Sequence, residues 1–263
     1  MRRFALAAMA MGLIGLSPAL GQDQTPPAES GLVSRDCPVS SRQTVAQSPL
    51  PNITQALKDR RKIKILTIGA SAAASRDPEN GYYGLIESYL EKAIKGLDVE
   101  IIDRGVSGEL ARDAVERIKT EVALNDIDLV LWQVGTFDAM AQVPAEEFEE
   151  TLTGTAEWLK SHHVDLVLVG LHYLRGYRSD KNYQIIREII RRVASKENVL
   201  RIGRYEAGEI LDKARTADKV PPSEFLLTEE GYSCMAELVA RALTTGLLAK
   251  PGQQAAPSPN GAR

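Results

Sequence analysis

Ser71 is the residue of this sequence with the clearest capacity for covalent chemistry. It follows Gly69 and Ala70 at the end of a short apolar run, residues 64–68, which has the composition of a β-strand. A serine at a turn from strand to helix can present its hydroxyl as a nucleophile while its own amide faces the same point. Ala73 stands where a Gly-x-Ser-x-Gly elbow would have its second glycine. Taken alone, Ser71 is equally compatible with a turn residue or a helix N-cap.

Two further turns come after the next two apolar runs. Residues 104–109 include Gly108 just before a helical pattern, where a free backbone amide could bind an anion. A turn that tolerates glycine is nevertheless the better explanation of this segment by itself. Residues 135–138, Gly-Thr-Phe-Asp, come after the third run.

The chain has three histidines, and one of them could act as a base. His162 and His163 end a predicted helix, where a cation offsets the negative end of the helix dipole, so a surface role is expected for both. His172 comes directly after an apolar run and could accept the proton of Ser71. The other interpretation is a hydrogen-bonded histidine beside Tyr173 that orients its loop through Arg175. No aspartate or glutamate that would orient His172 for catalysis is evident.

The elements that must position these residues alternate between apolar strands and amphipathic helices. The expected strands cover residues 64–68, 99–102, 127–134, 164–171 and 199–202, and the expected helices cover residues 82–94, 109–122, 146–160, 180–194 and 229–247. Such alternation predicts an α/β fold of three layers, with helices on both faces of an open parallel sheet. About five strands fit the flavodoxin-like order, in which functional residues gather at the carboxyl ends of the strands.

Taken together, the turns resemble the sequence blocks of the SGNH (GDSL-type) hydrolase family over about residues 60–248. The resemblance places Ser71 at the family's nucleophile and Gly108 at its oxyanion glycine. Residues 132–138 are similar to the family's strand that ends in Gly-Thr-Asn-Asp or Gly-Thr-Asn-Ala, and residues 227–232 resemble the segment directly after its Asp-x-x-His. The resemblance implies the SGNH hydrolase fold and an esterase ancestry.

The departures from the family pattern affect the catalytic groups. Phe137 stands at the oxyanion asparagine position, Ser223 at the triad aspartate and Leu226 at the triad histidine. Leucine cannot accept a proton from Ser71, and phenylalanine cannot donate a hydrogen bond to an oxyanion. Loss of one oxyanion donor alone costs about 3 kcal/mol of transition-state stabilisation. The sequence therefore predicts a pseudoenzyme with weak or no ester hydrolysis.

Three functions remain open at this point. The first is binding of a small molecule, a glycan or an envelope protein in the cleft at the strand ends. The second is an active serine esterase or acyl hydrolase that uses Ser71 with His172 as its base, and the third is a scaffolding role in the cell envelope. No metal-ligand spacing, P-loop or dinucleotide fingerprint is present, so we expect no metal and no cofactor. The 32 basic and 35 acidic residues form no long block of one sign, which argues against nucleic acid as a partner.

The first residues predict export. Residues 1–21 have the charged, apolar and small-residue order of a signal peptide. Their uncharged stretch of thirteen residues is shorter than the roughly 20 that cross a bilayer, so no transmembrane segment is expected. Residues 22–59, of which 22–50 are rich in Gln, Pro and Ser, are interpreted as an arm or linker, residues 60–250 as the domain and residues 251–263 as a disordered tail. The expected location is periplasmic or secreted.

Two cysteines, Cys37 and Cys234, remain after cleavage of such a signal. In an oxidising compartment an even pair indicates a disulfide, although two unrelated thiols remain the alternative from counting alone. The resemblance is closest to an exported bacterial subgroup with one cysteine before the first strand and another in the last helix. Those cysteines pair in the subgroup, which implies a Cys37–Cys234 bridge here.

Overall fold

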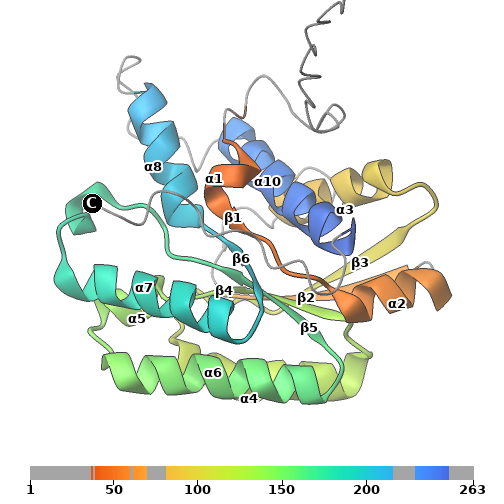
Figure 1. Cartoon of the computed structure of the whole chain (residues 1–263), viewed down its shortest axis with the longest axis horizontal. Helices are drawn as coiled ribbons and strands as arrows, with labels where there is room; N and C mark the ends of the chain where they lie inside the picture. Colours follow the sequence, from red (N-terminus) through yellow and green to blue (C-terminus); the bar gives the residue numbers. More distant parts are fainter. Residues whose placement is uncertain (1–36, 38, 60–61, 70–80, 216–228, 249–263) are drawn as a thin grey trace, which may run out of the picture. The chain divides into compact units, whose positions relative to one another are not determined.

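A computed structural model describes residues 37, 39–59, 62–69, 81–215 and 229–248, and in these residues six strands form a single sheet with helices on both faces (Figure 1). The chain divides into two units, and all of these residues belong to the second, Gly31–Arg263. The strands are β1 (Val45–Ala46), β2 (Lys62–Ile68), β3 (Asp98–Asp103), β4 (Leu129–Gln133), β5 (Asp165–Val169) and β6 (Leu200–Ile202).

The strand order is β1-β6-β5-β4-β2-β3, in which β2 to β6 run parallel and β1 pairs antiparallel with β6. Without β1, this is the flavodoxin-like order that the sequence predicts. The five expected strands are confirmed, with ends that differ by a few residues from the expected ones. The sixth strand is new. Its two residues, Val45 and Ala46, are too few to produce a periodic pattern.

Most helices come after the strands, as the predicted βαβ alternation requires. They are α1 (Ser41–Thr44), α2 (Pro51–Asp59), α3 (Tyr82–Ala93), α4 (Ala111–Asn125), α5 (Thr136–Met140), α6 (Ala145–Ser161), the 3-10 turn η1 (Arg175–Tyr177), α7 (Lys181–Lys196), α8 (Arg204–Arg215) and α10 (Glu229–Leu248). In Figure 1, α4, α6 and α7 lie on one side of the sheet and α2, α3 and α10 on the other.

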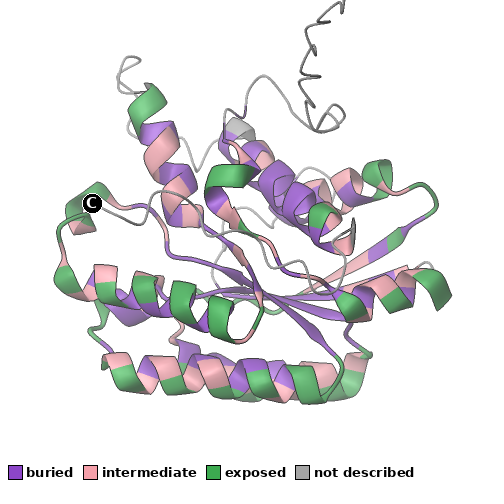
Figure 2. Ribbon diagram, in the orientation of Figure 1, coloured by how far each residue is buried: buried purple, intermediate pink, exposed green. Residues whose placement is uncertain are grey.

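The strands are apolar on both sides because helices cover both faces. In β4, Leu129 and Leu131 join the core under α3 and α10, whereas Val130 and Trp132 join the core under α4, α6 and α7. This division results from the strand period of two. Figure 2 shows the central strands in purple for buried, with the exposed residues of the helices turned away from the sheet.

The predicted arm contains more structure than its composition indicates. Val39 and Leu50 are buried, β1 adds to the sheet, and α2 buries Ile53 and Ala56. The described part of residues 22–59 therefore packs on the domain as part of its core. The sequence did not indicate this packing, because short elements can bury side chains without showing a periodic pattern. The predicted signal peptide, residues 22–36 of the arm and the predicted tail lie outside the described residues.

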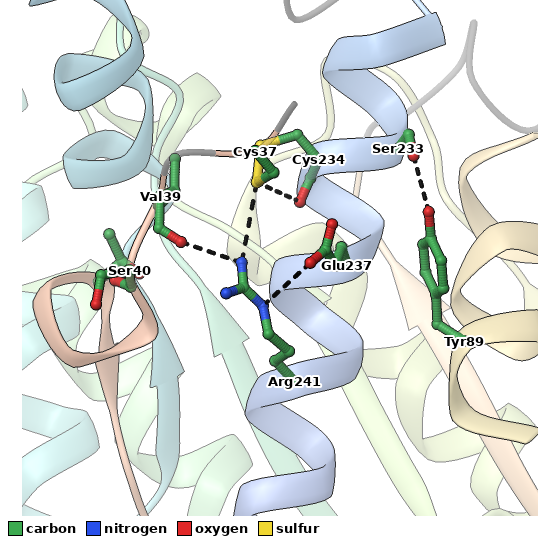
Figure 3. The surroundings of a disulfide bond; sticks show 9 residues. Cys37, Val39, Ser40, Tyr89, Ser233, Cys234, Glu237 and Arg241 are labelled. Carbon is green, nitrogen blue, oxygen red and sulfur yellow. Dashed lines mark hydrogen bonds and ion pairs between the residues drawn. A yellow bond between two sulfur atoms is a disulfide. The ribbon is translucent and has the colours of Figure 1, made fainter. Parts of the chain in front are cut away.

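The expected disulfide is present and fastens the N-terminal segment to α10 (Figure 3). Cys37 and Cys234 are bonded, with their Cα atoms 4.9 Å apart. Close to the bridge, the buried Arg241 donates a hydrogen bond of 3.0 Å to the carbonyl oxygen of Val39 and lies 3.8 Å from Glu237. The segment around Cys37 thus covers α10, which is itself buried along most of its length (Figure 2).

Asp165 joins β5 to the start of α2. Its carboxylate accepts hydrogen bonds from the backbone N–H groups of Asn52 (3.0 Å) and Ile53 (2.9 Å) and from the Asn52 side chain (2.8 Å). These bonds satisfy N–H groups that a helix start leaves unpaired. Burial nevertheless raises the pKa of Asp165 to about 6, because the hydrogen bonds offset only part of the desolvation cost.

Asp165 should make the protein less stable as the pH rises from about 4 to about 6. A raised pKa means that the folded state still holds this proton where the unfolded state has released it, so the stabilisation present at low pH is lost through this window. A shift of this size corresponds to about 3 kcal/mol. Urea unfolding of the wild type and of Asp165→Asn between pH 4 and 7 isolates this contribution, since asparagine does not titrate. Parallel pH curves for the two proteins would contradict the assignment.

Candidate functional site

The ends of β2, β3 and β4 meet so closely that only glycine fits between them. A Cβ atom on Gly69 would lie 2.0 Å from the carbonyl oxygen of Gln133, and a Cβ atom on Gly105 would lie 2.3 Å from the carbonyl oxygen of Gly69. Gly69 also has a positive φ of 96°, which side chains disfavour. Gly69 and Gly105 are therefore required by the backbone packing that forms this edge of the sheet.

A small pocket opens at the same edge, near the point where the order of the parallel strands reverses. This is where open α/β sheets bind their ligands. Its volume is about 310 Å³, including the part that is open to solvent. The lining comes from the end of β4 and the start of α5, the loop before α4, the end of β5 and the start of α8: Glu109, Gln133, Val134, Gly135, Thr136, Phe137, Gly170, His172 and Arg204.

The structure brings two of the predicted site residues into this pocket. Phe137 and His172 both line it, and each is partly accessible. Gly108 lies in the exposed loop that leads to α4 and has a positive φ of 81°, a backbone conformation that favours glycine. It is not part of the lining, but the next residue, Glu109, is.

Three other predicted site residues, Ser71, Ser223 and Leu226, lie outside the described residues. The structure therefore describes the site only on the side of the cleft that β4, β5, α8 and the loop before α4 form. The nucleophile and triad positions of these three residues stay predictions from the sequence resemblance.

His172 is held through its backbone. Its N–H donates to the hydroxyl of Thr136 (3.0 Å), and its carbonyl oxygen accepts from the hydroxyl of Tyr183 (2.7 Å). Burial, together with the positive charge of Arg204, holds the pKa of His172 well below its ordinary value, so the imidazole is neutral. Among the described residues, no carboxylate lies within ion-pair distance of the imidazole to orient it.

Tyr173 and Arg175 contact α8, whereas the sequence analysis considered that His172 orients its loop through Arg175. The hydroxyl of Tyr173 donates to Asp212 in α8 (3.0 Å), and Arg175 forms an ion pair with the same carboxylate. Arg175 therefore anchors the loop after β5 to α8 through Asp212 and makes no hydrogen bond to His172 that the structure describes.

The aspartate of the third sequence block has a structural role. Asp138 is buried, and its carboxylate accepts a hydrogen bond of 2.8 Å from the backbone N–H of Ala111, the first residue of α4. Burial raises the pKa of Asp138, while the hydrogen bonds that it accepts act in the opposite direction. Asp138 thus fixes the start of α4 against α5, the helix that carries Phe137.

Arg204, which the sequence analysis missed, lines the pocket. It is the first residue of α8, directly after Gly203 at the carboxyl end of β6, and its Nη1 donates to Oε1 of Gln133 (2.8 Å). Arg204 is partly buried, and burial lowers the pKa of its guanidinium. Its position just after a predicted strand was the available signal, but no helix was predicted over residues 204–215, so the inward turn of this arginine was missed.

Two general properties complete the description. In the described ranges, no helix is long and apolar enough to cross a membrane, and no group of three or more His, Cys, Asp or Glu residues could hold a metal ion. His162 and His163, at the end of α6, are exposed, as expected for histidines with a surface role.

Comparison with known proteins supports the fold. A model of the non-GDSL lipase-like family matches residues 36–249. Among solved structures, the esterase EstA from Pseudoalteromonas sp. is 15% identical with a TM-score of 0.56, over 71% of this chain and 99% of that one. The acetylxylan esterase Axe2 from Geobacillus stearothermophilus is 19% identical with a TM-score of 0.55, over 72% and 95%. No curated protein sequence matches the chain.

A further solved structure that resembles this chain was crystallised with a glycan. A two-domain esterase active on acetylated mannans, crystallised with mannopentaose, is 16% identical with a TM-score of 0.63, over 83% of this chain and 60% of that one. At these identities the likenesses concern the fold, and they confirm the SGNH hydrolase architecture that the sequence blocks indicate.

Proposed function

Because the chain belongs to the non-GDSL lipase-like family, we propose that it is an exported protein of the SGNH hydrolase fold that binds a small molecule or a glycan in the pocket at the strand ends and hydrolyses esters slowly or not at all. Its export rests on the signal-peptide pattern, and the disulfide is consistent with an oxidising compartment such as the periplasm.

The position of Phe137 carries this proposal. Its side chain lines the pocket at the place in the third block where the family has an asparagine. A phenyl ring cannot donate a hydrogen bond to an oxyanion, and the loss of one such donor lowers the rate by about 10²–10³. The sequence also has Leu226 at the position of the catalytic base. The missing donor and the missing base act on the same step.

The pocket lining suits a polar ligand. Apolar surface comes from Val134 and Phe137, and hydrogen-bonding groups come from Gln133, Thr136 and Arg204. Small-molecule pockets commonly combine an apolar wall with a few converging polar groups. The mannopentaose bound to one similar esterase supports a glycan as the ligand. An envelope protein bound at this edge, or a scaffolding role, would leave these polar groups without a purpose.

A second candidate function is supported by His172. Its neutral imidazole lines the pocket, and a neutral imidazole can accept a proton from a serine hydroxyl. In this case the chain would be an active serine esterase with Ser71 as nucleophile and His172 in place of the missing base.

Reaction with a fluorophosphonate ester separates the two functions before a substrate is known. We expect the purified mature protein to remain unlabelled at Ser71 over hours, because an unactivated serine hydroxyl reacts slowly. Intact-mass and peptide mass spectrometry would measure this, with Ser71→Ala as the control for labelling elsewhere. Stoichiometric labelling of Ser71 within minutes, abolished by His172→Ala, would overturn the proposal and establish the esterase.

A further inference from the structure

The pocket contains two hydrogen-bond donors that the described residues do not fully use. Gln133 is 8% exposed, and its Nε2 is buried without a hydrogen-bond partner among the described residues, since its Oε1 accepts from Arg204. Arg204 has five N–H donors, and its hydrogen bond within the described part of the chain is the one to Gln133. Both side chains line the pocket, where Arg204 keeps part of its surface accessible.

Among the residues that the structure describes, no carboxylate forms an ion pair with Arg204 to balance its positive charge. Glu109, the carboxylate in the lining, forms an ion pair with Arg117 of α4. His172 is neutral, and no carboxylate of the described residues lies within ion-pair distance of Arg204. Burial lowers the pKa of the guanidinium, which is the direction expected when desolvation is not offset by a neighbouring anion. An arginine in this environment is stabilised by an anion that enters the pocket.

We infer that Arg204, held in place by Gln133, binds the carboxylate of an acidic ligand, such as a sugar acid, in the pocket. The inference rests on the proposed function, whose ligand class it narrows. The bond to Gln133 fixes the planar guanidinium, whose fork of N–H groups matches a carboxylate.

The charges of the pocket favour a carboxylate over a phosphate. A carboxylate brings one negative charge, which Arg204 balances. A phosphate group carries a charge of roughly −1.5 to −2 at neutral pH, which the single positive charge of Arg204 does not balance. Phe137 and Val134 lie in the same lining and provide a surface for the carbon skeleton of the ligand.

The test compares two probes of the same shape and different charge, D-glucuronate and D-glucuronamide. Binding is measured by ligand-observed NMR titration. We expect the wild type to bind glucuronate at least about tenfold more tightly than glucuronamide, because one tenfold step is the size expected of a single charge-assisted interaction. Glucose 6-phosphate is the third probe, and tighter binding of this phosphate than of glucuronate would overturn the carboxylate assignment.

The variants assign the selectivity to Arg204. Arg204→Gln should bind both probes equally weakly, whereas Arg191→Gln, the same change at an exposed position of α7, should keep the selectivity of the wild type. Arg204→Lys keeps the positive charge without the planar fork, so it should retain only part of the selectivity for glucuronate. This variant tests the site even if Arg204→Gln fails to fold. Equal binding of the two probes by the wild type, or unchanged selectivity in Arg204→Lys and Arg204→Gln, would overturn the inference.

These results are independent of the test of hydrolysis. If Ser71 reacts quickly with the fluorophosphonate and glucuronate still binds through Arg204, the charge preference stands as a substrate preference and the proposal of slow hydrolysis fails. If Ser71 stays unlabelled and the wild type does not distinguish glucuronate from glucuronamide, the proposed function stands and the carboxylate site fails.

Discussion

Replacement of Cys37 and Cys234 by alanine is expected to lower the free energy of unfolding by about 5 kcal/mol. The bridge joins residues 197 positions apart, so it closes a loop that includes nearly the whole described fold. In the chain-entropy model, a loop of this length restricts the unfolded chain by about 5 kcal/mol. The effect is a large share of the roughly 5–15 kcal/mol that stabilises a typical domain.

The contacts around the bridge determine how the protein responds to its loss. Val39 and Leu50 are buried against α10, and Arg241 holds the carbonyl of Val39, so the N-terminal segment keeps part of its packing without the disulfide. We therefore expect the double variant to fold in the native arrangement with a lower unfolding midpoint. Reduction of the wild type should produce the same shift.

Urea unfolding of the oxidised, reduced and double-alanine proteins measures this effect. Ser233→Ala is a matched control, because Ser233 precedes Cys234 on α10 and its hydroxyl bonds to Tyr89 of α3 at 2.8 Å. Loss of that bond should cost about 1 kcal/mol. A double-alanine protein no less stable than Ser233→Ala would show that the bridge contributes little to stability.

The sequence predicts the central sheet because its strands are apolar on both faces. Runs such as residues 164–171 produce a strong signal, and helices around them must be amphipathic to cover the sheet. The signal fails where burial depends on distant contacts. In α8, Gly208 interrupts the helical pattern, yet a Cβ atom there would lie 2.5 Å from Cβ of Tyr173. The residue that weakens the local signal is therefore the one that allows α8 to pack closely.

In the site, too, some residues could be predicted from the sequence, and others depend on contacts between distant segments. His172 was identified because it comes directly after a predicted strand, at the edge where the ends of parallel strands converge. Phe137 was identified because it stands at the oxyanion asparagine position of the family that the sequence resembles. The pair formed by Gln133 and Arg204 was missed, since the two residues are 71 positions apart and no sequence spacing relates them. Their contact exists because β4 and β6 belong to the same sheet and α8 begins directly after β6.

Restoring the family's catalytic groups tests whether side-chain identity is what limits hydrolysis. The change is the triple variant Phe137→Asn, Ser223→Asp and Leu226→His. The pocket already receives the side chain of Phe137, so an asparagine there would present an amide to the same space. We expect hydrolysis of nitrophenyl acetate that depends on Ser71 and exceeds that of the unaltered protein by at least about 10²-fold, the effect of one oxyanion donor.

Recovery should nevertheless be partial. Catalytic groups must lie within about 0.5 Å of their productive positions, and the residues around them have had no reason to keep that fit. At position 137 the asparagine also adds a polar amide to a pocket wall that is now partly apolar, which lowers stability unless the amide finds hydrogen-bond partners. Thermal unfolding of the triple variant is therefore measured beside its activity.

Two matched proteins give the restoration a clear outcome. The triple variant with Ser71→Ala reports hydrolysis that does not use the nucleophile, and Phe137→Leu reports the effect of altering the pocket wall without adding a donor. A folded triple variant with no turnover dependent on Ser71 would show that the alignment of Ser223 and Leu226 with the triad is wrong. Equally fast, Ser71-dependent turnover by the unaltered protein would show that its own site is active, and His172 would then be the residue that replaces the missing base.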